Sequence, residues 1–227
     1  MKFFLIFFFV SCLFNHKAFS LDTIAKQAIL YDYETKTIIF EKNSEELMSP
    51  SSMSKIMTIY YVFKKIKDGD LKLTDKFKVS KKAWKKGGSK MFVNVNTMVS
   101  VEDLIRGIIV QSGNDACIVI AENIAGSEEA FATIMTSKAK EIGMINTNFT
   151  NSTGMHSDDN YSTVYDIAIL SQYLINEFPE YYHLFAETEF EWSGIKQKNR
   201  NPLLYKKMGV DGLKTGHLSI SGYGLVA

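Results

Sequence analysis

The spacing of apolar residues changes twice along this chain. Residues 27–32 and 37–40 are short β-prone runs separated by a turn-forming segment, which predicts an antiparallel hairpin. Apolar positions then recur every three or four residues in five segments, which is typical of helices that pack through one face; these begin near residues 50, 101, 114, 128 and 164. Strand-like runs return at 188–192, 212–216 and 222–227. The order of elements predicts an α+β fold, with a helical subdomain inserted into an antiparallel sheet.

Polar residues mark the expected ends of several helices. Segments 100–103 and 163–166 each place a hydroxyl residue three positions before an aspartate, as in a capping box. Ser127 is a further expected N-cap, Gly143 is expected to stop the helix that follows it, and Pro179 ends the last long helix. The local pattern therefore predicts where most of the helical subdomain begins and ends.

The first twenty residues resemble an export signal. Lys2 precedes an apolar run at 3–10, and Ala18 and Ser20 are small residues three positions and one position before the expected cleavage after Ser20. The apolar run is shorter than a membrane span requires, although an uncleaved anchor is the alternative. We therefore expect residues 1–20 to be a signal peptide and residues 21–227 to form the mature domain.

Charge and cysteine content narrow the class of protein. Removal of Lys2 and Lys17 leaves 24 basic and 25 acidic residues, a formal net charge of −1, so no global basic field favours nucleic acid. The lysine-rich segment 74–100 has no clear period and is interpreted as an irregular solvated loop. Cys12 lies in the signal, which leaves Cys117 without a disulfide partner and favours a buried helical position for it. Export without disulfides suits a bacterial envelope protein.

A serine three residues before a lysine occurs at 52–55, 137–140 and 193–196. At this spacing in a helix the two side chains share one face, so the lysine amine can take the proton of the serine hydroxyl. Ser52 also falls near the positive end of the helix expected from residue 50, where an oxyanion is stabilised. The alternative is that Ser52 and the serines beside it only cap that helix.

Two further motifs select the first of these pairs. Only Ser52 precedes Ser112-Gly113-Asn114 by about sixty residues and Lys214-Thr215-Gly216 by about a further hundred. Each motif alone is typical of a turn or a strand end, but the ordered set is typical of penicillin-recognising serine enzymes. From about residue 24 onward the chain resembles the D-alanyl-D-alanine carboxypeptidase family, the low-molecular-mass penicillin-binding proteins; the resemblance is carried by segments 50–58, 111–117, 199–201 and 211–217.

The resemblance implies a β-lactamase/DD-peptidase-like fold in which the last sheet strand and its covering helix are missing. Residues 21–227 are therefore expected to be a catalytic domain that is incomplete at its C-terminus. The missing segment leaves room for membrane attachment there. The family also implies a location in the bacterial periplasm or on the outer face of the cytoplasmic membrane, with no metal and no cofactor.

The resemblance further implies a role for each motif residue. Ser52 attacks the carbonyl between the two D-alanines of a peptidoglycan stem pentapeptide, and Lys55 is the base. Lys214 supplies a second cation that keeps Lys55 partly neutral, and it binds the substrate carboxylate. Ser112 relays a proton to the leaving amine, and β-lactams inhibit the enzyme by acylating Ser52.

Substrate contacts are assigned by the same resemblance. Asn114 is expected to position the substrate amide, and the backbone N–H groups of Ser52 and His217 to form the oxyanion hole. Thr215 is a further substrate-binding residue, while Arg200 and Ser89 match positions at the rim of the site. Leu218 stands where the family commonly has a threonine or serine, which puts the affinity for the carboxylate in doubt.

Three other functions compete with a carboxypeptidase. A class A β-lactamase would need a Glu-x-x-x-Asn pattern that residues 151–201 lack, and Gly113 in place of aspartate also favours a peptidase. A DD-endopeptidase that cuts peptide crosslinks is a close relative and stays open. A non-catalytic peptidoglycan-binding domain is disfavoured because a binder does not need the nucleophile and base that this chain retains.

Overall fold

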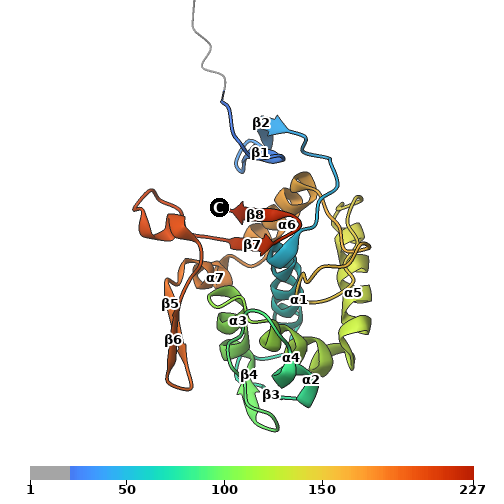
Figure 1. Ribbon diagram of the computed structural model, residues 1–227, viewed down its shortest axis with the longest axis vertical. Helices are drawn as coiled ribbons and strands as arrows, with labels where there is room; N and C mark the ends of the chain where they lie inside the picture. The colour runs from blue at the N-terminus through green and yellow to red at the C-terminus, as the bar shows by residue number, and fades with distance from the viewer. Residues whose placement is uncertain (1–20) are drawn as a thin grey trace, which may run out of the picture.

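The computed structural model describes residues 21–227, so the expected signal peptide lies outside the described residues. A block of helices occupies the centre of the molecule (Figure 1). Helix α1 (Lys55–Lys67) runs through this block and contacts α3 (Val101–Ile109), α4 (Asn114–Ala125), α5 (Glu128–Glu141) and α6 (Val164–Glu177). The strands lie around the block, which confirms the predicted α+β class.

Helix α1 is the core element. Its expected apolar stripe is buried, and so is almost everything else in its first two turns; the residues exposed by 1% or less are Lys55, Ile56, Met57, Thr58, Ile59, Tyr60, Val62 and Phe63. A helix that packs on all sides in this way sits inside a domain and not on its surface. The helix ends at Lys67, with Asp68 as its C-cap. Its first turn differs from prediction: Ser51–Ser54 is a 3-10 turn, since Ser51 has a left-handed φ of 53° that an α-helix does not accept.

The predicted helix caps are confirmed. The side-chain oxygens of Ser100, Ser127 and Thr163 each accept a hydrogen bond from the backbone N–H three residues later, at the starts of α3, α5 and α6. Gly126 ends α4 with a φ of 82°, a left-handed conformation that glycine adopts without strain. These caps are local, which is why the sequence pattern was sufficient to find them.

The strands form four separate antiparallel pairs: β1 (Ala28–Asp32) with β2 (Thr37–Lys42), β3 (Lys76–Lys78) with β4 (Met98–Ser100), β5 (Glu189–Trp192) with β6 (Ile195–Lys198), and β7 (Lys214–Leu218) with β8 (Gly222–Val226). The expected hairpin at the start of the chain is confirmed. The expected single antiparallel sheet is not present within residues 21–227. The strands there form four separate two-stranded pairs, and no hydrogen bonds join β1–β2 to β7–β8.

The lysine-rich segment 74–100 is also more ordered than expected. It contains β3, the short helix α2 (Lys81–Lys85) and β4. Phe77 and Val99 face each other across β3 and β4, and Val79 and Ala83 are fully buried. The sequence pattern did not predict these short elements because their few apolar residues are separated by lysines, whose long side chains extend into solvent.

The chain returns from α6 to the centre of the molecule through α7 (Pro179–Tyr182) and the 3-10 turns His183–Ala186 and Pro202–Tyr205. Strands β7 and β8 then pack against the 3-10 turn that precedes α1. A Cβ atom on Gly216 would lie 2.9 Å from Ser51 Oγ, so only glycine allows β7 to approach this closely. No helix within residues 21–227 combines the length and apolar character that a membrane crossing requires.

Candidate active site

Ser52 and Lys55 meet at the start of α1. Lys55 Nζ donates a hydrogen bond of 3.0 Å to Ser52 Oγ. Ser52 is half-buried, whereas its neighbours Ser51, Met53 and Ser54 are buried, so it is the side chain through which this turn reaches solvent. The turn leads into the N-terminus of α1, whose dipole favours negative charge on a serine oxygen. The pair therefore has the geometry of a nucleophile and its base.

The Lys55 ammonium group is held inside the protein by uncharged partners. Its Nζ also donates to Asn114 Oδ1 at 2.8 Å and to the carbonyl oxygen of Thr153. No described carboxylate forms an ion pair with it. The pKa of Lys55 is lowered to about 8, mainly by burial and to a smaller extent by the positive charges of Arg200 and Lys86. About a tenth of Lys55 is consequently neutral at pH 7, which is the form that can accept a proton.

Lys214 is a second buried cation. It is the first residue of β7, is 4% exposed, and donates to the carbonyl oxygen of Thr215 at 3.1 Å. Burial holds the pKa of Lys214 well below its usual value, and repulsion by Lys55 and Arg200 adds to the effect. The sequence interpretation ascribed a partly neutral Lys55 to its burial near a second cation, Lys214. In the structure the first cause is the burial of Lys55 itself.

The Ser112-Gly113-Asn114 turn joins α3 to α4. Ser112 is 2% exposed and has a φ of 55°, a left-handed conformation that lies three residues after the end of α3 at Ile109. A Cβ on Gly113 would lie 3.0 Å from Asp115 Oδ1 and 3.1 Å from the backbone N of Met91, so this turn favours glycine at its centre. The Ser112 hydroxyl forms no hydrogen bond with any described residue.

Asn114 uses both ends of its side-chain amide within the protein. Oδ1 accepts from Lys55, while Nδ2 donates to the carbonyl of Gly87 at 2.9 Å, and the Asn114 backbone N donates to the carbonyl of Ser89 at 2.7 Å. Asn114 therefore positions the base and fixes segment 87–89 beside it. The expected contact with a substrate amide stays a prediction.

The two residues predicted at the rim are brought together. Arg200 Nη1 donates to Ser89 Oγ at 2.5 Å, across a separation of 111 residues. The segment around Arg200 is held on both sides, because Asn199 Nδ2 donates to the carbonyl of Glu187 at 2.9 Å and Asn201 Nδ2 donates to the carbonyl of Gly212. These asparagines explain physically why the Asn-Arg-Asn motif places its central arginine at Ser89.

Thr215 and His217 lie on β7, on the face opposite to Lys214 and Gly216, as strand alternation requires. Thr215 is half-buried and His217 is exposed, with its ring 4.1 Å from that of Tyr223 on β8. Leu218 ends β7 opposite Gly222. Among the described residues no hydrogen bond joins their side chains to Ser52 or Lys55, so their roles as substrate contacts stay predictions.

A loop to which the sequence interpretation gave no role in the site completes the surroundings of Lys55. Asn151 Oδ1 accepts hydrogen bonds from the backbone N–H groups of Thr153, Gly154 and Met155, which folds residues 151–155 into a tight loop. Gly154 has a φ of 77°, and a Cβ there would lie 1.7 Å from the carbonyl oxygen of Ser51. The signal available in the sequence was the Asn-x-x-Gly spacing at 151–154.

Asp115 is a second residue that the sequence interpretation missed. Its carboxylate is buried and accepts from the backbone N–H groups of Met91, Phe92, Val93 and Ala116. It therefore anchors the segment that follows Ser89 to the start of α4. An aspartate directly after Asn114 gave no sign of this role in the sequence.

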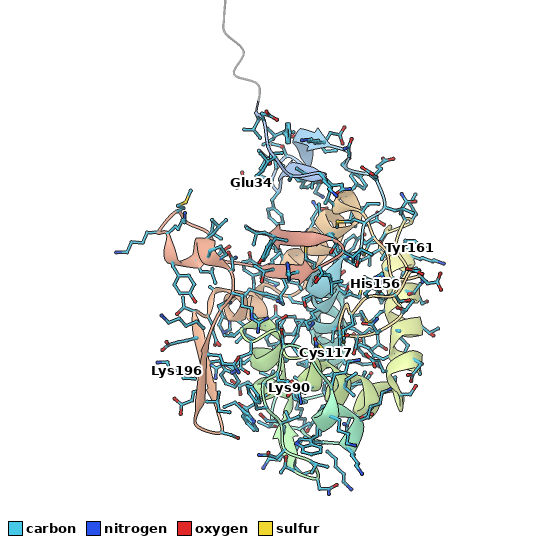
Figure 2. All side chains as sticks on the ribbon, in the orientation of Figure 1. Glu34, Lys90, Cys117, His156, Tyr161 and Lys196 are labelled. Atoms are coloured by element: carbon cyan, nitrogen blue, oxygen red, sulfur yellow. The ribbon has the colours of Figure 1, made fainter. Side chains whose placement is uncertain are left out.

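The other two Ser-x-x-Lys matches are excluded by their surroundings. Ser137 and Lys140 are both exposed on α5. Lys196 lies on β6 in the hairpin at one side of the molecule, where it pairs with Glu189 at 2.5 Å (Figure 2). Figure 2 also shows Cys117 within the helical block, and its predicted burial in a helix is confirmed.

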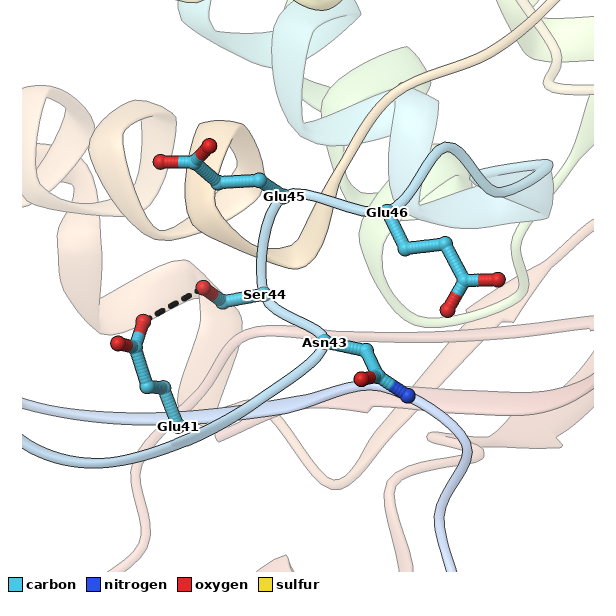
Figure 3. Close-up of a pocket in the computed structure, with 5 residues that line it drawn as sticks. All are labelled: Glu41, Asn43, Ser44, Glu45 and Glu46. Carbon is cyan, nitrogen blue, oxygen red and sulfur yellow. Dashed lines mark hydrogen bonds between the residues drawn. The ribbon is translucent and has the colours of Figure 1, made fainter.

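The depression shown in Figure 3 lies elsewhere. It is lined by Glu41, Asn43, Ser44, Glu45 and Glu46, and the Ser44 hydroxyl donates to Glu41 at 2.6 Å. It has no lysine or histidine to serve as the base of a serine nucleophile. Within residues 21–227 no group of three or more histidine, cysteine, aspartate or glutamate side chains is arranged to hold a metal ion.

Comparison with known proteins identifies the family to which the chain belongs. The D-alanyl-D-alanine carboxypeptidase family of S11 peptidases matches residues 15–227, so the chain belongs to that family. It is 42% identical over 210 residues to D-alanyl-D-alanine carboxypeptidase DacC of Escherichia coli K12 and 41% identical over 207 residues to DacA of Haemophilus influenzae. These alignments cover 89% of this chain but 52% and 53% of the relatives, so the chain spans about half their length.

Solved structures show the same fold. Penicillin-binding protein 5 of Haemophilus influenzae is 39% identical and superimposes with a TM-score of 0.87, covering 90% of this chain and 60% of that protein. Penicillin-binding protein D2 of Listeria monocytogenes, solved in an ampicillin-bound form, is 28% identical with a TM-score of 0.78, covering 88% of this chain and 82% of that protein. The chain therefore has the fold of the penicillin-binding DD-peptidases.

Proposed function

We propose that this protein is a serine-type D-Ala-D-Ala carboxypeptidase that removes the terminal D-alanine from peptidoglycan stem pentapeptides. The observation that carries the proposal is the 3.0 Å hydrogen bond between Lys55 Nζ and Ser52 Oγ, made by a lysine whose pKa burial lowers to about 8. A buried lysine with that pKa is a competent general base near neutral pH. Membership of the carboxypeptidase family supports the same activity.

In the proposed reaction, neutral Lys55 takes the Ser52 proton as Ser52 Oγ attacks the carbonyl between the two D-alanines. The negative charge of the tetrahedral intermediate develops at the N-terminal end of α1, where the backbone N–H groups of Ser52 and His217 are the proposed donors. The C–N bond then breaks, the proton passes through Ser112 to the leaving amine, and D-alanine departs. Water activated by Lys55 hydrolyses the remaining ester and releases the shortened peptide.

Substrate binding is proposed to use the second cation. The Lys214 ammonium group is the partner for the terminal carboxylate, and its burial without an acidic partner supports this role. Arrival of a carboxylate would favour the charged form of Lys214. Asn114, Thr215, Arg200 and Ser89 are the proposed contacts along the rest of the peptide. β-Lactams would acylate Ser52 through the same contacts.

A DD-endopeptidase is the second candidate. A D-alanyl-D-alanine endopeptidase of Escherichia coli is 29% identical to this chain, whereas carboxypeptidases reach 38 to 42% identity over similar lengths. The higher identity favours the carboxypeptidase. A non-catalytic peptidoglycan-binding domain is disfavoured because Ser52 is hydrogen-bonded to the buried Lys55, an arrangement that a binder does not need.

Labelling of the full-length protein with a fluorescent penicillin tests the proposal. The parent protein should form a covalent adduct and Ser52→Ala should not, whereas Ser137→Ala, in an exposed Ser-x-x-Lys pair, should label like the parent. Absence of label on a folded parent protein would refute the acyl-enzyme. Release of D-alanine from a pentapeptide, measured beside cleavage of a crosslinked dimer, then distinguishes carboxypeptidase from endopeptidase.

The cellular location is part of the proposal. Residues 1–20 are proposed as a cleaved export signal, and the mature protein as an enzyme of the bacterial periplasm or the outer face of the cytoplasmic membrane, where peptidoglycan is accessible. N-terminal sequencing of the exported protein tests this directly. A mature N-terminus at Leu21 is expected, and retention of Met1 would contradict a cleaved signal.

A further inference from the structure

Glu128 is a buried carboxylate that the catalytic scheme does not use. It is the first residue of α5 and is 5% exposed. Oε1 accepts hydrogen bonds from the Ser152 hydroxyl at 3.1 Å and from the Ser152 backbone N at 3.3 Å. Oε2 lies 3.8 Å from Nζ of Lys82 and 3.8 Å from Nζ of Lys86. One carboxylate therefore joins an internal loop to two lysines at the surface.

The loop that Glu128 holds is the one that holds the base. Ser152 directly precedes Thr153, whose carbonyl oxygen accepts from Lys55 Nζ. On its other side, the Ser152 carbonyl accepts from Thr58 Oγ1 at 2.8 Å, one turn after Lys55 on α1. Ser152 is thus fixed between α5 and α1. Any change in its anchoring changes where the Thr153 carbonyl meets the amine.

Glu128 is also a carboxylate whose negative charge raises the pKa of Lys55, an effect smaller than that of burial, which lowers it. The positive charges of Arg200 and Lys86 act in the opposite direction and lower the pKa of Lys55. Lys214 is a further buried cation, whose own pKa is lowered by repulsion from Lys55. Cys117 on α4 also faces Lys55, but its thiol is neutral because burial raises its pKa to about 12.

The remaining acidic groups near Glu128 are engaged elsewhere or point outward. Asp115 accepts only backbone N–H groups. Glu129, the next residue on α5, has a side chain that is 74% exposed and pairs with Lys82 at 3.0 Å.

We propose that Glu128 is a positioning residue for the base: it holds Ser152, and with it the Thr153 carbonyl, against Lys55, and it places a negative charge paired with Lys86 behind that loop. This inference deepens the proposed function and rests on it, because Lys55 has to be the base. Lys86 carries the opposing charge, since it pairs with Glu128 at 3.8 Å and also lowers the pKa of Lys55.

The two residues have opposite expected effects on the pH profile. Glu128→Gln keeps an oxygen acceptor for Ser152 but removes the negative charge, so Lys55 loses its proton at lower pH and the acidic limb of acylation moves down by about half a pH unit. Lys86→Gln removes a repelling cation, so the same limb moves up. A purely structural role for Glu128 would leave the limb in place, because the glutamine retains the contact with the loop.

The experiment measures the second-order rate of acylation of the full-length protein by a fluorescent penicillin as a function of pH. Glu129→Gln is the matched control: it removes the same charge one residue away at an exposed position and should keep the parent profile. Opposite shifts for Glu128→Gln and Lys86→Gln, with none for Glu129→Gln, support the proposal. An unshifted profile for Glu128→Gln, or a shift in the same direction as Lys86→Gln, overturns it.

Thermal unfolding of each variant accompanies the profiles. If Glu128→Gln does not fold, the surface variant Lys86→Gln carries the test, and an unshifted limb in that variant refutes the proposed balance of charges. Failure of the proposed function and failure of the Glu128 proposal give different results. A parent protein that folds but does not label refutes the proposed function, whereas a labelled parent with unshifted variants refutes only the role of Glu128.

Discussion

Lys55 Nζ lies 2.8 Å from Asn114 Oδ1, a hydrogen bond that joins residues 59 positions apart and ties the start of α1 to the start of α4. Both helices present their N-terminal ends at this point. The amide oxygen of Asn114 is neutral, so it orients the amine without stabilising its charge as a carboxylate would. A base that has to be neutral part of the time is better served by an asparagine than by an aspartate.

Replacement of that asparagine by aspartate tests this relationship. In Asn114→Asp a negative charge beside Lys55 raises the pKa of the amine, so we expect acylation at pH 7 to fall about tenfold or more and its acidic limb to move to higher pH. Asn123→Asp is the control, since Asn123 lies on the same helix and contacts the backbone of Lys78. Equal profiles for the two variants would contradict the role of Asn114.

The pH dependence of acylation by the parent protein follows from the lowered pKa of Lys55. Burial disfavours the charged amine, so the reactive neutral form grows as pH rises towards a pKa of about 8. We expect the acylation rate to rise through an acidic limb with its midpoint near that value. Rates measured from weakly acidic to alkaline pH check this. A midpoint close to the ordinary lysine pKa would show that burial does not tune the base.

Removal of the Lys55 amine should slow acylation and leave the protein folded. Lys55→Met has a side chain of similar volume with no base, so we expect acylation to fall by about 10²- to 10⁴-fold. Lys140→Met provides the comparison, because Lys140 is exposed on α5 and belongs to an excluded Ser-x-x-Lys pair. Circular dichroism verifies that both variants are folded. Retention of parental rates in Lys55→Met would remove Lys55 from the mechanism.

Gly154 should be intolerant of any side chain. A Cβ there would overlap the Ser51 carbonyl oxygen at 1.7 Å in addition to straining a φ of 77°, so we expect Gly154→Ala to lower the free energy of unfolding by about 3 kcal/mol or more. Gly194→Ala has a similar φ of 76° but open space around it, and should lose only about 1 kcal/mol. Denaturant unfolding measures both; similar losses would show that close approach is not the cause.

Local features of this fold were predictable from the sequence because their causes are local. The caps at Ser100, Ser127 and Thr163 depend on a side chain and an N–H three residues away, and the β1–β2 hairpin depends on neighbouring runs and their turn. Strands β3 and β6 were not predicted, because lysines alternate with their few apolar residues and hide the period. The expected single sheet was not found because pairing between distant strands is decided by tertiary packing.

The sequence by itself determined the family and the order of the motif residues, since Ser52, Ser112 and Lys214 follow one another at the spacing that this chemistry needs. It did not determine the state of Lys55. That state depends on burial against α4 and residues 151–155, and on charges at Glu128, Lys86 and Arg200. A pKa reflects desolvation and charge at distances set only by the folded chain, so the sequence was enough to select Ser52 as the proposed nucleophile, while the lowered pKa of Lys55 required the structure.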